Sequence, residues 1–365
     1  MLTRTPFFEI HKKYNAKLID FGGFEMPVQY EGIKKEHMAV RERVGMFDVS
    51  HMGEFFITGK EALDLIQHVT INDATKLFPG RAQYSAMCYE DGGIVDDLII
   101  YMMSEEEYML VVNASNKDKD LDWINQNNTF DAVVTDKSDD MCLLAVQGPQ
   151  APKCLQSLTE INLEAIKFYH FEKGHFAGCD NVIISVTGYT GEAGFELYFD
   201  KNEVNPETIW EAIMEAGKDF DIAPAGLGAR DTLRLEMGYA LYGNDISKDT
   251  HPFEARLGWI TKLDKGSFIG KGALLAIKEK GSDRKTIGFE MAAAKKIPRQ
   301  GYEVTDGAGT VIGQVTSGGM SVLKDKGIGM AIVSKDALGE KENVFIKIRN
   351  NEEEAIVVTP PFIRK

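Results

Sequence analysis

The chain has 365 residues, of which 44% are hydrophobic and 27% charged, and its formal net charge is −15. At roughly 100–200 residues per domain, this length predicts two or three domains, and the composition is typical of a soluble globular protein. So acidic a chain repels phosphodiester backbones and anionic lipids, which argues against nucleic acid and membrane as partners. No apolar run approaches the roughly 20 residues of a membrane span. Because residues 1–8 also lack the features of a secretory signal, we predict a cytoplasmic enzyme.

The first part of the chain predicts a mixture of helices and strands. Thr5 and Pro6 indicate the N-cap and the first residue of an opening helix. Residues 46–58 are rich in aromatic and β-branched side chains, which predicts one strand. Asp91-Gly92 between two apolar runs is a strong signal for a β-hairpin. The other elements predicted here are a helix over 32–44, a strand over 108–112 and a polar helix that runs through Trp123.

The rest of the chain predicts an α+β body followed by an all-β module. Helices and hairpins alternate without a regular β-α-β period, which favours α+β over a doubly wound parallel sheet. From about residue 283, short strands are separated by turns with glycine and asparagine, which predicts a small barrel. We therefore expect a body over 1–280 and a barrel domain over 283–365. The predicted barrel strands are 286–291, 301–306, 310–316, 327–333, 343–348 and 354–358.

Asp96 and Asp97 lie inside an apolar predicted strand. Adjacent strand residues point to opposite faces, so each aspartate shares its face with apolar neighbours. A carboxylate in such a place is costly unless it is paired, and its raised pKa suits it to proton transfer on an amine. The alternative is that both acids belong to a half-exposed edge strand or bond to neighbouring amides.

Two further clusters carry polar groups suited to a flat ligand. In the glycine-rich stretch 188–196, Tyr189 could stack on a ring and Glu196 could accept a bidentate hydrogen bond, or the stretch is a plain hairpin. Arg230 and Arg234 are four residues apart on a predicted helix, so they share one face and could clamp an anion. The alternative for these arginines is a structural ion-pair network. Neither cluster matches the dinucleotide fingerprint.

Other catalytic patterns are missing from the sequence. There is no G-x-S-x-G, no P-loop lysine and no H-E-x-x-H, and the four cysteines form no C-x-x-C pair. We therefore expect no metal site and no structural disulfide.

Several stretches together resemble one known family. They are 45–52 (GMFDVSHM), 84–87 (YSAM), 92–98 (GGIVDDL), 111–114 (VVNA), 147–149 (QGP), 187–196 (TGYTGEAGFE), 224–236 (PAGLGARDTLRLE), 316–319 (TSGG) and 360–362 (PPF). In this order they resemble the aminomethyltransferase, or T protein, of the glycine cleavage system, from about residue 5 to the end.

The resemblance implies a three-domain clover-leaf, with two interleaved α+β subdomains over 1–280, whose central hole holds tetrahydrofolate. The family moves the one-carbon unit of an aminomethyl group from the lipoyl arm of the H protein to tetrahydrofolate. Methylenetetrahydrofolate, ammonia and a dihydrolipoyl arm result. Tetrahydrofolate is thus the implied co-substrate, without a metal. The implied partners are the lipoylated H protein, glycine decarboxylase and dihydrolipoamide dehydrogenase.

The resemblance also implies roles for particular residues. Asp97 matches the second aspartate of the family's pair and would hold or deprotonate the pterin nitrogen that attacks the one-carbon unit. Glu196 and Arg230 would bind the polar pterin edge through bidentate contacts. The other implied folate contacts are Met52, Tyr84, Asn113, Tyr189 and Tyr239. Phe168 and Tyr169 stand near a position that is often aromatic in the family, but their register is not fixed and neither is assigned.

Three relatives with the same fold are alternatives. One branch binds folate and assists iron–sulfur enzymes, but it has a cysteine where this chain has Ser267, in Lys265-Gly-Ser-Phe. A second is the folate half of a sarcosine or dimethylglycine oxidase, whose flavin domain has no counterpart in the sequence. A third is a folate-dependent demethylase acting on a sulfur compound. Fold alone does not separate these activities.

Overall fold

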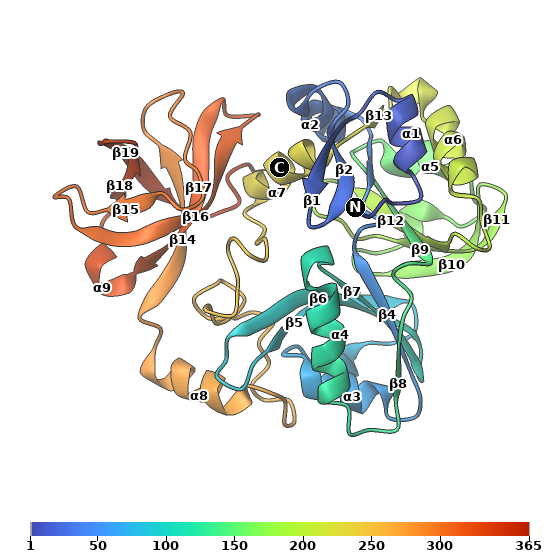
Figure 1. Ribbon diagram of the computed structural model, residues 1–365, viewed down its shortest axis with the longest axis horizontal. Coiled ribbons are helices and arrows are strands. Elements are labelled where there is room, and N and C mark those ends of the chain that lie inside the picture. Colours follow the sequence, from blue (N-terminus) through green and yellow to red (C-terminus); the bar gives the residue numbers. More distant parts are fainter. Residues whose placement is uncertain (1, 365) are drawn as a thin grey trace. The chain divides into compact units, whose positions relative to one another are not determined.

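The computed structural model describes residues 2–364 of the chain, which form two compact units. Unit 1 holds the residues up to Ile66, Ala74–Tyr84 and Leu98–Asp231; unit 2 holds Gln67–Asp73, Ser85–Asp97 and the residues from Thr232 onwards. The elements that run from one unit into the other are α3 (Ala62–Val69), β5 (Arg81–Cys88), β6 (Ile94–Ser104) and α7 (Leu227–Met237) (Figure 1). Helices and sheets are mixed as predicted, so the α+β class is confirmed. The predicted division near residue 283 stays a prediction.

A six-stranded sheet in unit 1 has the order β10-β11-β12-β9-β3-β13. Its strand β9 (Met141–Gln147) is buried at every residue, which explains its nearly continuous apolar sequence. Trp210 on α6 (Pro206–Ala216) belongs to the same core cluster as the apolar side chains of β9. Helix α6 lies beside α5 (Ala151–Gln156) (Figure 1). The other strands are β3 (Gly45–Asp48), β10 (Phe171–Phe176), β11 (Cys179–Ser185), β12 (Gly194–Asp200) and β13 (Ala223–Pro224).

A second sheet has the order β5-β6-β7-β4-β8. Its β5–β6 hairpin turns at Gly92, whose φ of 90° favours glycine, and the Gly93 N–H donates to Asp91 Oδ1 at 2.9 Å. The hairpin predicted from Asp91-Gly92 is therefore confirmed, with the turn chemistry that predicted it. The remaining members are β4 (Gly53–Thr58), β7 (Glu107–Val112) and β8 (Val133–Asp136), with α4 (Lys117–Gln126) against β8.

The predicted N-cap at Thr5 is wrong. Helix α1 (Phe8–Lys13) begins three residues later and has no side-chain cap. The Thr5 hydroxyl instead donates to Asp48 Oδ2 at 2.6 Å, and His11 Nε2 lies 2.9 Å from the same oxygen. The Thr5 side chain, predicted as the helix N-cap, is thus hydrogen-bonded to the buried carboxylate of Asp48, which lies 43 residues further along the chain.

The single strand predicted over 46–58 is also wrong, because the chain forms two strands there, β3 and β4, in different sheets. The break lies at residues 49–52. There the Ser50 N–H donates to Asp48 Oδ1 at 2.9 Å, and the Met52 N–H donates to the Val49 carbonyl at 3.1 Å. Such a side-chain-to-backbone turn ends a strand even where the residue types favour one.

A closed barrel in the order β14-β17-β16-β15-β18-β19 lies in unit 2 and confirms the predicted barrel module. Its interior is filled by apolar side chains such as Phe289, Val304 and Ile346. The strands are β14 (Arg284–Met291), β15 (Glu303–Thr305), β16 (Val311–Ser321), β17 (Lys326–Ser334), β18 (Asn343–Ile348) and β19 (Asn351–Val358). The remaining helices and strands are β1 (Lys17–Phe21), β2 (Phe24–Gln29), α2 (Ile33–Glu42), α8 (Lys271–Lys280) and α9 (Lys335–Leu338).

The four cysteines are free, and three of them, Cys88, Cys142 and Cys154, are buried. Burial raises the pKa of all four thiols, including the half-buried Cys179. Among residues 2–364, no helix is long and apolar enough to cross a bilayer.

Candidate functional site

The turn between β11 and β12 is held by the side chain of Gln147. The Gln147 Nε2 donates to the Thr187 carbonyl at 3.1 Å, and the Thr190 hydroxyl donates to Gln147 Oε1 at 2.8 Å. A Cβ on Gly188 would lie 2.1 Å from that oxygen, so glycine is required for this approach. Gly194 has a φ of 158° and approaches the same side chain. Gly188 and Gly194 therefore allow the backbone to pack closely against Gln147.

Tyr189 in this turn stacks with Arg230 from α7. The Arg230 guanidinium carbon lies 4.4 Å from the centroid of the Tyr189 ring, which is a cation–π contact. The turn itself is held by Arg41, whose Nη1 donates to the Thr190 carbonyl at 2.6 Å and pairs with Glu192 at 2.8 Å. The stacking restricts the orientation of the Arg230 guanidinium. A fixed orientation of its N–H donors suits binding to the edge of a planar ligand.

Glu196 lies on β12, and both of its hydrogen bonds reach the same carboxylate oxygen. Its Oε2 accepts from the Thr187 hydroxyl at 2.5 Å and from the Tyr198 hydroxyl at 3.3 Å. Burial raises the pKa of Glu196, while the hydrogen bond from Thr187, the charge of Arg230 and the hydrogen bond from Tyr198 oppose that shift. Tyr189, Arg230 and Glu196 are thus brought together in unit 1 from separate parts of the chain.

His51 also lies within the reach of Arg230, although the sequence prediction gave it no role. Burial, and then the charge of Arg230, lower the pKa of His51 to about 4, so its imidazole is neutral at pH 7. The rings of Phe21 and Phe24 contact it edge-on. A histidine in an apolar stretch is more often part of a core than of a site, so the sequence alone offered no signal for it.

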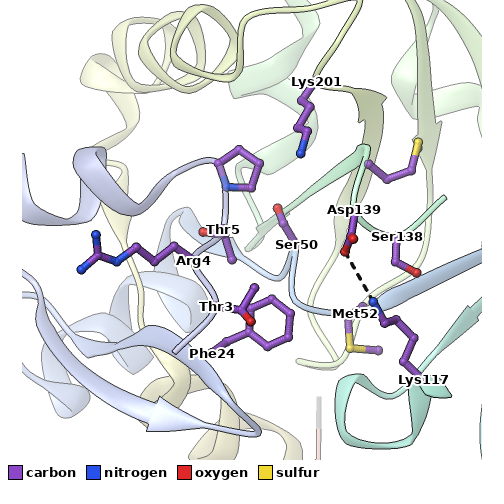
Figure 2. Close-up of a pocket in the computed structure, with 12 residues that line it drawn as sticks. Thr3, Arg4, Thr5, Phe24, Ser50, Met52, Lys117, Ser138, Asp139 and Lys201 are labelled. Atoms are coloured by element: carbon purple, nitrogen blue, oxygen red, sulfur yellow. Dashed lines mark hydrogen bonds and ion pairs between the residues drawn. The ribbon is translucent and has the colours of Figure 1, made fainter. Parts of the chain in front are cut away.

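A cavity of about 330 Å³ opens in unit 1, and Met52 is the predicted site residue that lines it (Figure 2). Figure 2 shows Lys201 and Lys117 approaching it from different sides, and Lys117 pairs with Asp139 at 3.4 Å. Sequence reasoning missed both lysines because they are scattered among the acidic residues. The other lining residues are Thr3, Arg4, Thr5, Pro6, Phe24, Ser50, Ser138 and Met141.

The other predicted residues are half-buried and accessible in part. Tyr84 on β5 and Asn113, just after β7, belong to unit 1, whereas Asp97 on β6 and Tyr239, just after α7, belong to unit 2. Asp96, the neighbour of Asp97, is fully buried. Of the two acids, Asp97 is therefore the one that solvent or a ligand can reach.

Arg234 is a structural residue rather than half of an anion clamp. Its Nη1 donates to Asp245 Oδ2 and to Ser317 Oγ, both at 2.9 Å, within unit 2. Its side chain is 3% exposed. The ion-pair alternative therefore holds for Arg234, while Arg230 stacks on Tyr189.

Two models of known protein families together match nearly the whole chain. The family described as "GCVT N-terminal domain" matches residues 7–265, and the "Glycine cleavage T-protein C-terminal barrel domain" matches residues 284–363. An aminomethyltransferase from Chloroherpeton thalassium is 52% identical over 362 residues, which is 99% of each chain. One from Flavobacterium psychrophilum is 52% identical over 364 residues, which is 100% of each. The crystal structure of glycine cleavage system aminomethyltransferase T from Bartonella henselae superimposes with a TM-score of 0.91 at 33% identity, covering 100% of this chain and 98% of that one.

Proposed function

Because the chain belongs to the glycine cleavage T-protein family and is an aminomethyltransferase, we propose that it uses tetrahydrofolate as acceptor and a lipoylated H protein as donor. The aminomethyl carbon leaves the sulfur of the lipoyl arm and its nitrogen departs as ammonia, so that the carbon bridges two nitrogens of the folate. The sulfur regains a proton as a thiol. Glycine decarboxylase and dihydrolipoamide dehydrogenase complete the system, which we place in the cytoplasm.

The observation that carries this proposal is the cluster of Tyr189, Arg230 and Glu196. Glu196 Oε1 accepts no hydrogen bond from any residue that the structure describes, so it is available to a ligand N–H. Arg230 offers planar N–H donors in a restricted orientation. A pterin edge carries donors and acceptors side by side, so the residues fit it. Tetrahydrofolate supplies the nucleophilic nitrogen when bound.

The other predicted site residues would handle the proton of the attacking nitrogen or contact the rest of the folate. Asp97 holds or removes the proton of the attacking nitrogen, because it is the accessible carboxylate of its pair. Met52 packs against the apolar part of the folate, and Tyr84, Asn113 and Tyr239 complete its contacts.

A reconstituted assay tests the function. Purified protein with lipoylated H protein, glycine decarboxylase, glycine and tetrahydrofolate should release ammonia and form methylenetetrahydrofolate in equal amounts. Leaving out either the H protein or the folate should abolish that release. Activity with a methylated sulfur compound and folate, without ammonia from the complete system, would instead favour the demethylase alternative.

The carrier must dock, and we propose that a local basic patch receives it. The candidates are the run Lys295, Lys296 and Arg299 and the tail Arg364-Lys365, of which Lys365 lies outside the described residues. Lys295 is exposed, whereas Lys296 already pairs with Glu353 at 2.5 Å. Lys295→Glu should therefore raise the KM for H protein severalfold at low salt and leave the Kd for folate unchanged, with a smaller effect at physiological ionic strength.

Lys335→Glu is the matched control, because Lys335 is an exposed barrel-module lysine that lies outside this run. The double variant Lys295→Glu/Lys296→Glu should have the larger effect on KM. Carrier kinetics that remain unaltered in the double variant at low salt would place the docking surface elsewhere.

A further inference from the structure

We propose that Thr187, Tyr198 and Tyr101 are positioning residues for Glu196, which anchor one carboxylate oxygen so that the other is presented to the ligand. This inference rests on the proposed function, in which Glu196 binds the pterin edge. It adds residues that do not themselves touch the ligand.

Strand register places these hydroxyl groups around the carboxylate. Ser185 on β11 lies directly opposite Glu196 on β12, and Tyr198 is two residues further along β12, so these three side chains share one face. Thr187 follows β11 at the start of the glycine-rich turn. Tyr101 reaches the same point from β6, in the other sheet.

The hydroxyl groups form a closed circuit around Oε2. Thr187 Oγ1 lies 2.5 Å from Glu196 Oε2, and Tyr198 OH lies 3.3 Å from the same atom. Tyr101 OH lies 2.9 Å from Tyr198 OH and 3.1 Å from Thr187 Oγ1, so it links the two donors. Ser185 Oγ lies 2.9 Å from Thr187 Oγ1.

One proton for each hydroxyl restricts how this circuit can be arranged. When Glu196 is ionised, its carboxylate is purely an acceptor, so Thr187 and Tyr198 each donate their single proton to it. Neither has a proton left for its other contacts, so the Thr187–Ser185 contact then needs the proton of Ser185, and Tyr101 donates its single proton to either Thr187 or Tyr198. All four hydroxyl groups are buried, so water cannot replace a missing donor cheaply. The circuit therefore favours the ionised, oriented form of Glu196.

The electrostatics agree with this role. Burial raises the pKa of Glu196, and Thr187, Arg230 and Tyr198 each lower it again. The pKa of Tyr101 and that of Tyr198 are raised by burial and by the charge of Glu196, so both tyrosines stay protonated donors. Glu54, whose own pKa is raised well above the usual range by burial, also raises the pKa of Tyr198. Loss of a hydroxyl donor should therefore raise the pKa of Glu196.

The test is the affinity for tetrahydrofolate as a function of pH, measured by calorimetry. In the wild type, affinity should fall as pH decreases through the pKa of Glu196. In Thr187→Val and in Tyr198→Phe the midpoint of that fall should move to higher pH, with about tenfold weaker binding between the two midpoints. Thr187→Ser, which restores the hydroxyl, should return the midpoint toward the wild-type value.

Tyr108→Phe is the matched control. Tyr108 is a fully buried tyrosine of unit 1 whose hydroxyl has no hydrogen-bond partner in the described part of the chain. Its loss should leave the midpoint where it is. In a Glu196→Gln background, Thr187→Val should have no further effect on the pH profile, because the titrating group is gone.

An unchanged midpoint in both Thr187→Val and Tyr198→Phe would overturn the proposal, even if stability fell. Absence of folate binding to the wild type would instead defeat the proposed function. In that case, ¹³C NMR titration of the Glu196 carboxyl in the ligand-free protein tests whether the hydroxyl groups set the pKa of Glu196. The two variants should raise its pKa, and an unshifted titration would overturn the positioning role.

Discussion

Asp97→Asn is expected to lower turnover by roughly a hundred- to ten-thousand-fold while leaving the thermal unfolding midpoint nearly unchanged. The amide keeps the size of the side chain but can neither take a proton nor carry the negative charge. Asp97 is half-buried on β6, and asparagine has nearly the same shape, so we expect the strand to keep its packing. Steady-state kinetics in the reconstituted system, with dihydrolipoamide dehydrogenase and its electron acceptor added to reoxidise the lipoyl arm, measure turnover, and calorimetry measures unfolding.

Asp96→Asn provides the comparison, and it should reduce turnover far less. Asp96 is fully buried, so its exchange should be seen mainly as a lower unfolding midpoint. The opposite ranking in kcat would show that Asp96, and not Asp97, faces the reacting nitrogen. Equal, small effects of both variants would remove this pair from the chemistry.

Arg230→Lys is expected to weaken tetrahydrofolate binding by about ten- to a hundred-fold, corresponding to on the order of 1.5–3 kcal/mol for a charge-assisted hydrogen bond. Lysine keeps the charge but loses the planar fork and the stacking on Tyr189. Because the charge remains, the pKa of His51 should stay low and the fold should be retained. Isothermal titration with tetrahydrofolate measures the effect.

Arg81→Lys is a suitable control, because Arg81 is an exposed arginine whose guanidinium carbon lies 5.5 Å from the Phe78 ring. Like Arg230, Arg81 makes a cation–π contact with an aromatic ring, but it is not predicted to bind the folate. Unchanged folate affinity in Arg230→Lys would reduce Arg230 to a structural partner of Tyr189 and Glu196. A loss in Arg81→Lys as large as in Arg230→Lys would show that the assay reports on general charge.

Local signals predicted those parts of the fold in which the chain determines its own conformation. The turn at Asp91-Gly92 needs a positive φ that glycine supplies, and the barrel strands are apolar runs between such turns, so both could be predicted. The predictions that fail depend on distant partners. The Thr5 hydroxyl donates to Asp48 and does not cap the helix. The strand predicted over 46–58 is interrupted where Asp48 accepts a hydrogen bond from the Ser50 N–H.

The candidate site shows the same division. The residue pattern singled out Tyr189, Arg230 and Glu196, and the resemblance implied their roles. Their proximity follows from tertiary structure, since Arg230 comes from a helix and Glu196 from a strand. His51 was missed because only the folded chain places it near Arg230.

Strand β8, with the sequence VVTD and mostly exposed residues, was missed because too few apolar positions mark it.

The buried cysteines have a consequence for the chemistry of the carrier. Thiol–disulfide exchange needs a thiolate, and the raised pKa values of Cys88, Cys142 and Cys154 keep these sulfurs protonated as well as out of reach. The lipoyl arm of the proposed donor alternates between dithiol and disulfide. An accessible thiolate on the enzyme would be captured by the oxidised arm as a mixed disulfide. The burial of these three sulfurs therefore removes them as sites at which the proposed donor could become covalently joined to the protein.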